Sequence, residues 1–336
     1  MVITMCTAAS LLAEDHYFGR NLDLEYSYNE TVVITPRNYC FKFREVDNIE
    51  THYAMIGMAF VVDNYPLYYE ACNEKGLSMA GLNYYEADYK EFDENKDNVT
   101  PFEFISWVLC QCENVKEAIE LIKNINLVKI NFSEELPLSP LHWMISDREQ
   151  SIVVECDADG LKIYYNPIGV MTNSPSFDKQ VFNLNDYRHL SSKTPKNTFC
   201  ENLQLDVYSR GMGGIGLPGD LSSSSRFVRA AFTLLNVVLG DSEEVNVSQF
   251  FHVLGSVTQQ RGCCEVAQGK YEYTIYSSCI NTDKGIYYYK TYYNSQISAV
   301  NMYDYDLTNE ELDIYPLIDT PQINYQNGKK EEYMFN

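Results

Sequence analysis

The sequence is poor in basic residues: its 336 residues include 25 lysines and arginines against 47 aspartates and glutamates, a formal net charge of -22. A protein that binds the phosphates of a nucleic acid needs a basic face, and no basic stretch here is longer than Lys329-Lys330. The chain also lacks any run of about 18 apolar residues, the length that a membrane-spanning helix requires. We therefore expect neither a nucleic-acid partner nor a membrane span.

Targeting and linker signals are missing as well. Residues 1–13 are apolar enough to imitate the core of a signal peptide, but no lysine or arginine precedes them. The segment Glu14-Asp15-His16 follows them where a small-residue cleavage site would stand. No segment rich in proline, glycine or serine divides the chain. We expect a cytoplasmic protein that folds as one domain.

The ten cysteines lack the paired spacing of a zinc ribbon and the density of a small disulfide scaffold. Cys110 and Cys112 have no second cysteine or histidine pair nearby to complete a metal site, and the same is true of the adjacent Cys263 and Cys264. We expect these residues to be buried as small apolar side chains, the thiols to be reduced, and no metal to be bound.

Familiar catalytic motifs are also lacking. None of the five histidines lies in a metal-binding or triad motif, and His142, at the start of a predicted strand, is expected to be structural rather than a base. There is no Gly-x-Ser-x-Gly elbow, and the glycines between 211 and 216, a predicted flexible loop, match no nucleotide-binding loop. A hydrolase built on a cysteine and a histidine stays open, without a motif to support it.

Periodicity and turn signals predict an alternation of strands and helices. Thr100 with Glu103, and Asn114 with Glu117, are typical of capping boxes at the starts of two helices. Strands first, then helices, strands, helices and strands indicate two sheets between helical layers, an α+β architecture. The predicted strands are 2–7, 17–22, 31–35, 52–62, 141–146, 151–156, 161–165, 170–172 and a β-meander over 271–302; the predicted helices are 101–112, 115–125, 225–239 and 247–257.

Among the nucleophile candidates, Cys6 stands out by its position. A thiol is a weak nucleophile until a base and a positive charge favour the thiolate. If Cys6 were the first residue of the mature chain, its own α-amine, with a reference pKa of ~7.7–8.0, would be that base. Removal of Met5 as an initiator methionine, or loss of residues 1–5 from a longer precursor, would expose it.

Several segments spread over nearly the whole chain share one pattern. They are Met5-Cys6-Thr7, Phe18-Gly19-Arg20-Asn21-Leu22-Asp23, Asn73-Glu74-Lys75-Gly76-Leu77, Ala80-Gly81-Leu82-Asn83, Leu141-His142-Trp143-Met144-Ile145-Ser146-Asp147, Thr172-Asn173-Ser174-Pro175, Gly216-Leu217-Pro218-Gly219-Asp220 and Ser225-Arg226-Phe227. Together they resemble the choloylglycine hydrolase family. The resemblance implies an N-terminal-nucleophile hydrolase of four-layer αββα fold, with two antiparallel sheets between helical layers. It also implies removal of residues 1–5, a single catalytic domain over 6–336, no cofactor, a homotetramer and a gut bacterium as source.

Position by position, the resemblance implies that Cys6 is the nucleophile, Arg20 the neighbouring cation and Asp23 the carboxylate that holds the α-amine. A guanidinium beside sulfur favours the thiolate, and a carboxylate that accepts from the amine directs its lone pair toward the thiol. Without the surrounding motifs, Arg20 and Asp23 would be interpreted as an ion pair on a strand surface.

The resemblance also implies an oxyanion hole formed by Asn83 and Asn173, one through its backbone N–H and the other through its side-chain amide. Uncharged donors suit the negative charge that develops on a carbonyl oxygen under attack. Arg226 matches the arginine that completes the site. On their own, the two asparagines would be interpreted as turn residues.

The reaction implied is hydrolysis of the amide bond in glycine- or taurine-conjugated bile salts. A rigid steroid calls for an apolar pocket, and Leu22, Tyr28 and Tyr69 lie in segments expected to line it; plain strand packing is the alternative. The stretch Ser209-Arg210-Gly211 resembles the bile salt hydrolase variant associated with glycine conjugates. A planar carboxylate suits the guanidinium of Arg210 better than a sulfonate does, so we expect a modest geometric preference.

Two other interpretations stay open. Penicillin V acylases use the same machinery, although Gly81-Leu82-Asn83-Tyr84 resembles bile salt hydrolases more closely. A noncatalytic thiol-based binding or sensing protein would have no need of a free N-terminal cysteine. Residues 1–4 depart from the family, whose members usually begin with Met-Cys; this departure leaves the start codon open but does not affect the nucleophile.

Overall fold

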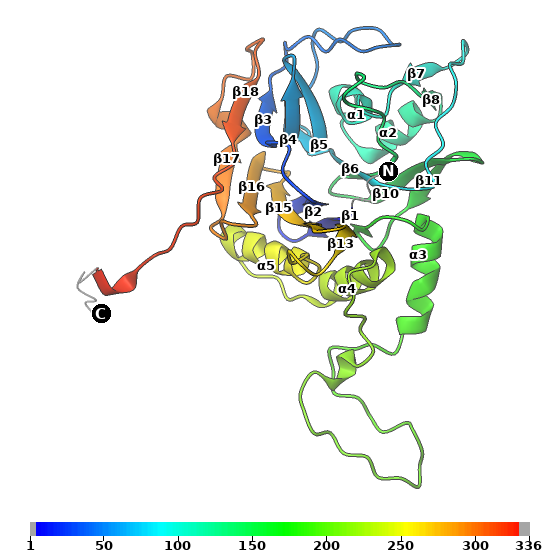
Figure 1. Cartoon of the computed structure of the whole chain (residues 1–336), viewed down its shortest axis with the longest axis vertical. Helices are drawn as coiled ribbons and strands as arrows, with labels where there is room; N and C mark the ends of the chain where they lie inside the picture. Colours follow the sequence, from blue (N-terminus) through cyan, green and yellow to red (C-terminus); the bar gives the residue numbers. More distant parts are fainter. Residues whose placement is uncertain (1–4, 329–336) are drawn as a thin grey trace.

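A computed structural model describes residues 5–328 and contains two large sheets of antiparallel strands (Figure 1). The six-stranded sheet holds, in spatial order, β12 (Val170–Met171), β1 (Met5–Leu12), β2 (His16–Leu24), β15 (Tyr273–Asn281), β16 (Ile286–Thr291) and β17 (Ser298–Asn301). The eight-stranded sheet holds β11 (Gly160–Tyr165), β10 (Ser151–Asp157), β9 (Leu141–Ser146), β6 (Ser78–Asn83), β5 (Tyr65–Asn73), β4 (Met55–Val62), β3 (Thr31–Thr35) and β18 (Asp313–Pro316). Two short ribbons pair β7 (Asp97–Val99) with β8 (Ile125–Leu127) and β13 (Glu265–Ala267) with β14 (Lys270–Tyr271).

Helices cover the outer face of each large sheet, as Figure 1 shows. The pair α1 (Phe104–Gln111) and α2 (Val115–Ile122) packs on the eight-stranded sheet, and the pair α4 (Ser223–Asn236) and α5 (Glu243–Gly255) packs on the six-stranded one. The shorter α3 (Phe177–Asn183) lies beside α4. The predicted four-layer αββα arrangement of two antiparallel sheets between helices is therefore confirmed.

Two apolar cores hold the layers together. One fills the space between the sheets and the space under α4 and α5, and the other lies between the eight-stranded sheet and the pair α1 and α2. Every residue of β2 is buried, because this strand lies inside its sheet and is covered on both faces. Polar side chains on β1 and β2 are thereby removed from water, which strengthens their interactions with each other.

Most of the predicted elements are confirmed, including the meander over 271–302 and its turn before Ile286. Strand 52–62 begins later, at Met55. The part of strand 2–7 that precedes Met5 lies outside the described residues. The sequence interpretation missed the strands β5, β6, β7, β8, β13 and β18 and the helix α3. Asp63 and Asn64, with φ of 51° and 59°, form the tight turn that joins β4 to β5.

The two predicted capping boxes differ in outcome. The Asn114 side chain accepts from Glu117 N at 3.0 Å and caps α2 as predicted. The prediction of a capping box at Thr100 is wrong. The Thr100 hydroxyl donates to the Glu103 carboxylate at 2.6 Å, and that carboxylate also accepts from Arg44 N at 2.9 Å. With both side chains occupied in this way, α1 begins only at Phe104.

The two pairs of neighbouring cysteines differ in burial. Cys110 and Cys112 are buried as predicted, but Cys263 is exposed and Cys264 only half-buried, so the prediction of burial was wrong for this pair. Both follow Gly262, whose φ of 102° turns the chain at the surface after α5. All ten cysteines lie in the described part of the chain, and none of them is paired in a disulfide. No helix among residues 5–328 is long and apolar enough to cross a membrane.

Candidate active site

The thiol of Cys6 and the guanidinium of Arg20 are in direct contact. The hairpin of β1 and β2 pairs Cys6 with Leu22 and Ala8 with Arg20, so the two side chains lie on the same face of adjacent strands. Arg20 Nη2 lies 2.5 Å from Cys6 Sγ, and both residues are buried. The predicted pairing of a sulfur with a neighbouring cation is present in this geometry.

Arg20 is held by the facing sheet. Its Nη1 donates to the backbone oxygen of Gly81 at 2.6 Å and of Tyr69 at 3.2 Å, and its Nε lies 3.9 Å from the Glu70 carboxylate. Burial acts to lower the pKa of Arg20, but the negative charges of Cys6 and Glu70 outweigh it and raise this pKa. The guanidinium is therefore a permanent charge at the sulfur.

The Cys6 thiol still needs a base. Burial raises the pKa of Cys6, and the charge of Arg20 opposes that rise without reversing it. With residue 5 still attached, Cys6 N is an amide that donates to Asn173 Oδ1 at 2.9 Å and has no basic lone pair. A free α-amine at this position would supply the missing base.

Arg226 connects the backbone of Cys6 to Asn173. Its Nη1 donates to the carbonyl oxygen of Cys6 and to Thr7 Oγ1 at 2.8 Å, while its Nη2 donates to Asn173 Oδ1 at 2.6 Å. Burial lowers the pKa of Arg226, and the charge of Asp23 opposes this shift. These contacts fix the orientation of the Asn173 amide, because its oxygen faces the arginine and its nitrogen must face away.

Asn83 and Asn173 also contact each other. Asn173 Nδ2 donates one hydrogen to the backbone oxygen of Asn83 at 2.8 Å, and an amide nitrogen carries two. The structure thus brings Asn83, Asn173 and Arg226 together around Cys6, at the start of β1. The second amide hydrogen is the one that could point at a developing oxyanion.

Asp23 is buried one strand position beyond Leu22 and is bound by other groups. Its carboxylate accepts from Thr274 Oγ1 at 2.6 Å and from Gln259 Nε2 at 3.1 Å. Burial raises the pKa of Asp23, while Arg226 and these two hydrogen bonds lower it. Asp23 lies close enough to Cys6 to influence the thiol electrostatically.

Sequence reasoning missed Glu272. Its Oε1 accepts from the backbone N–H of Met5 at 2.7 Å, while its Oε2 is buried with no hydrogen-bond partner in the described part of the chain. Burial and the charge of Asp23 raise its pKa to about 8. A carboxylate within a segment of tyrosines at the start of a buried strand was the signal that could have revealed Glu272. Glu70, in the equally apolar β5, carried the same signal.

The structure places the three residues predicted to line the substrate pocket at different depths. Leu22 is buried in the core, Tyr69 is half-buried, and Tyr28 is exposed, with its hydroxyl 3.0 Å from that of Tyr26. A cavity of about 290 Å3 opens beside the segment 27–31, which includes Tyr28. The residues that line it are Ser27, Asn29, Glu30, Thr31, Tyr273, Ile275, Thr291, Tyr292, Tyr293, Pro316, Leu317 and Asp319.

Arg210 lies in the long segment between α3 and α4. Figure 1 shows this segment extending away from the sheets and helices as a loop, and Arg210 is exposed on it. The neck of the loop is closed by the Ser191 N–H, which donates to Gly213 O at 2.9 Å. The structure therefore does not place Arg210 among the residues around Cys6.

Comparisons with known proteins agree with this geometry. The family model of linear amide C–N hydrolases, choloylglycine hydrolase family, matches residues 6–317. The bile salt hydrolase/transferase of Lactiplantibacillus plantarum is 60% identical over 314 residues, which cover 93% of this chain and 97% of that protein.

Solved structures give the same result. The crystal structure of a single-residue variant of the conjugated bile acid hydrolase from Clostridium perfringens has a TM-score of 0.89 at 39% identity; the match covers 96% of this chain and 100% of that one. The penicillin V acylase of Agrobacterium tumefaciens shares the fold with a TM-score of 0.71 at 20% identity, covering 92% of this chain and 90% of that one. With its fold, its Cys6 and Arg20 pair and these matches, the chain belongs to the choloylglycine hydrolase family of linear amide C–N hydrolases.

Proposed function

We propose that this chain hydrolyses the amide bond of glycine- or taurine-conjugated bile salts with Cys6 as an N-terminal nucleophile. The contact between Arg20 Nη2 and Cys6 Sγ, at 2.5 Å, is the observation that carries the chemistry. The substrate class is supported by the bile salt hydrolase/transferase that is 60% identical to this chain. Membership in a hydrolase family favours an enzyme over a thiol-based binding or sensing protein.

The first half of the reaction forms a thioester. The Cys6 thiol passes its proton to the α-amine as the sulfur bonds to the carbonyl carbon of the substrate, and Arg20 stabilises the negative charge on sulfur. When the tetrahedral intermediate collapses, the C–N bond breaks and the ammonium returns the proton to the leaving nitrogen. Glycine or taurine departs, and the bile acid stays on Cys6.

The second half repeats the sequence with water. The α-amine takes a proton from water as the oxygen adds to the thioester carbon; the C–S bond then breaks, and the sulfur regains the proton. In both halves the carbonyl oxygen becomes negative, and the free hydrogen of Asn173 Nδ2 and the backbone N–H of Asn83 are the donors assigned to it. Neither half requires a cofactor or a metal.

The α-amine exists only after residues 1–5 are removed. Residues 1–4 lie outside the described residues, while Met5 pairs with Asp23 at the start of the hairpin. In this proposal, loss of Met5 turns the Cys6 amide into an amine among Asn173, Asp23 and Glu272, and residues 6–336 form the single catalytic domain. Asp23 is the carboxylate assigned to orient that amine.

The experiment that tests this function is hydrolysis of glycocholate, taurocholate and penicillin V side by side, with Cys6→Ala as the control. We expect release of glycine and taurine by the wild-type protein, and none by Cys6→Ala. Penicillin V acylase activity is the rival, and the acylase compared above supports a shared fold alone. Faster turnover of penicillin V than of either bile salt would favour that rival.

Assembly and location complete the proposal. The loop between α3 and α4 exposes large apolar side chains, including Phe199 at 81% and Tyr208 at 84%, a pattern typical of contact surfaces. We assign these side chains to contacts in a homotetramer, which light scattering on the purified protein tests directly. Unpaired cysteines throughout the described chain are in keeping with a reducing cytoplasm.

A further inference from the structure

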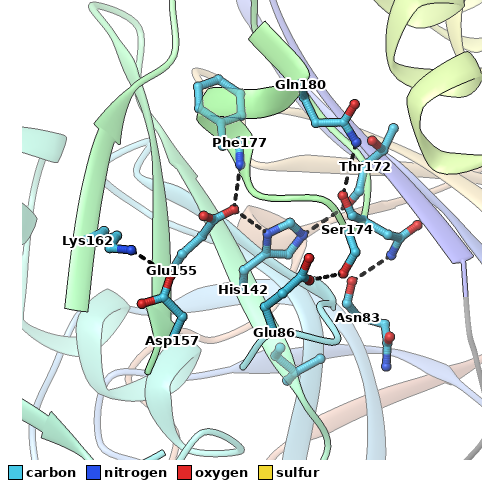
Figure 2. A network of polar contacts seen from close by, with 12 residues as sticks. Asn83, Glu86, His142, Glu155, Asp157, Lys162, Thr172, Ser174, Phe177 and Gln180 are labelled. Carbon is cyan, nitrogen blue, oxygen red and sulfur yellow. Dashed lines mark hydrogen bonds and ion pairs between the residues drawn. The ribbon is translucent and has the colours of Figure 1, made fainter. Parts of the chain in front are cut away.

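His142 makes two hydrogen bonds, which Figure 2 shows, and one stacking contact. Its Nδ1 lies 3.1 Å from Glu155 Oε1 and its Nε2 lies 3.0 Å from the backbone oxygen of Thr172. Its ring is parallel to that of Tyr84 within 4°, with the ring centroids 4.7 Å apart. The prediction that His142 is a satisfied, structural imidazole is confirmed.

The partners of His142 give it a more specific role. A backbone carbonyl only accepts, so the contact to Thr172 requires a hydrogen on Nε2. Glu155 Oε1, which contacts Nδ1, also accepts a hydrogen bond from the backbone N–H of Phe177 at 2.9 Å. The pair of His142 and Glu155, on neighbouring strands β9 and β10, therefore binds the segment 172–177 at both of its ends.

That segment carries Asn173. The helix layer adds two contacts: Asn173 N donates to Ser223 Oγ at 2.9 Å, and Gln180 Nε2 donates to Asn173 O at 3.3 Å. The Ser174 hydroxyl also accepts from Tyr85 N at 2.9 Å and donates to the Glu86 carboxylate. The segment is thus fixed between the helices on one side and the pair of His142 and Glu155 on the other. A shift of the segment would displace the Asn173 amide relative to Cys6.

We propose that His142 and Glu155 are positioning residues that hold the Asn173 amide in place as an oxyanion donor. This inference rests on the proposed function, in which Asn173 Nδ2 stabilises the carbonyl oxygen under attack. Among residues 5–328, His142 has no hydrogen bond to Cys6 or to the other groups around the sulfur. It acts through the backbone of Thr172. Its loss should therefore impair a step that develops an oxyanion and spare a step that does not.

Two reactions of Cys6 separate these cases. Amide hydrolysis passes through an oxyanion, whereas alkylation of the thiol by iodoacetamide does not develop a charge on a carbonyl oxygen at the site. His142→Phe keeps a flat ring against Tyr84 and removes both hydrogen bonds. We expect kcat for glycocholate to fall about 10- to 100-fold with KM little changed, below the ~10²- to 10³-fold cost of deleting an oxyanion donor outright.

The alkylation rate of Cys6 in His142→Phe should stay within about twofold of the wild-type rate. Asp157→Asn is the matched control, because Asp157 lies at the end of the same strand as Glu155 but binds Lys162, at 2.7 Å, and not the segment 172–177. It should leave kcat unchanged. In the background of Asn173→Ala, His142→Phe should cause no further loss, because the donor that it positions is already gone.

A wild-type kcat in folded His142→Phe would overturn the inference, and so would an equal fall in hydrolysis and alkylation. If His142→Phe does not fold, Glu155→Gln tests the same point, with a smaller loss of kcat expected. Hydrogen exchange of the peptide over 172–177 gives a readout that needs no substrate: we expect faster exchange in either variant. If wild-type protein fails to hydrolyse bile salts, the proposed function fails, while unchanged exchange would separately refute the positioning role.

Discussion

The backbone N–H of Met5 donates to the carboxylate of Glu272 at 2.7 Å, so a carboxyl group with a pKa of about 8 lies beside the peptide that precedes Cys6. Burial is the main cause of this pKa, and the charge of Asp23 adds to it. A glutamate in the unfolded chain has a pKa near 4.5. The protonated form of Glu272 is therefore favoured by folding.

This difference predicts a pH dependence of stability. Because the folded pKa is raised, the stabilising contribution is fully present below pH 4.5 and is lost as the pH rises through about 8. In Cys6→Ala protein that retains Met5, the free energy of unfolding should fall across this window by at most about 1.4 kcal/mol per pH unit. Glu272→Gln in that background should remove most of the slope, as urea unfolding at several pH values would measure. Equal slopes in the two proteins would refute the assignment.

Substitution of Cys6 tests the nucleophile. Cys6→Ala should abolish hydrolysis of glycocholate while the far-ultraviolet circular dichroism and the unfolding midpoint stay close to wild type. Cys6→Ser should retain at most a trace of activity, because a hydroxyl ionises far less readily than a thiol. Near-normal turnover by Cys6→Ala would show that another residue attacks the substrate.

Arg20 and Glu70 form a buried pair whose two effects can be separated. Arg20→Met leaves Glu70 buried without its cation, so we expect a loss of about 3 kcal/mol in the free energy of unfolding. Cys6 should also react at least tenfold more slowly with iodoacetamide at neutral pH, because the thiolate loses its stabilising charge. Denaturant unfolding and the alkylation rate measure the two effects.

The double variant Arg20→Met with Glu70→Gln separates them. Removal of the second charge should restore much of the stability, since neither partner is then buried and unpaired. The slow alkylation should persist, because Glu70→Gln provides no cation at the sulfur. Recovery of alkylation together with stability would mean that Arg20 supports the fold and not the thiolate.

The outline of the fold was predictable from the sequence because its signals are local. The helices around Ser225 and Val247 and the strands from 141 to 172 carry periodic apolar residues with turn residues between them. Strands β5 and β6 were missed for a physical reason: β5 carries Pro66 and the buried Glu70, which break the apolar pattern of a strand. Tyr276 and Tyr287, which bind the Glu70 carboxylate, lie on the other sheet, and such contacts cannot be recognised from local sequence.

The residues of the site also fall into those that the sequence predicts and those that it does not. Cys6, Arg20, Asp23, Asn83, Asn173 and Arg226 were assigned from motifs, and the structure brings them into one cluster. The contacts of Glu272 and Glu70 depend on strands about 200 residues or more away in sequence, at Met5 and at Tyr276 and Tyr287. No local pattern indicates such a pairing. Arg210 was assigned from a motif alone, and the structure places it on the exposed loop.

Arg210 carries a prediction on substrate preference. If its guanidinium recognises the planar carboxylate of glycine conjugates, Arg210→Ala should lower kcat/KM for glycocholate more than for taurocholate. The change in the ratio should correspond to roughly 1–3 kcal/mol, the range expected for small differences in substrate shape. An unchanged ratio would remove Arg210 from substrate recognition. Lys193→Ala, on the same loop, is the control for a general effect of a lost positive charge.

The account depends most on a free α-amine at Cys6. The buried thiol has a raised pKa, and within residues 5–328 no histidine is hydrogen-bonded to it. Intact mass spectrometry of a purified sample whose hydrolysis of glycocholate has been measured tests this directly. We predict a mass that corresponds to residues 6–336, with Cys6 as the first residue. Fully active protein that retains Met5 would contradict the mechanism.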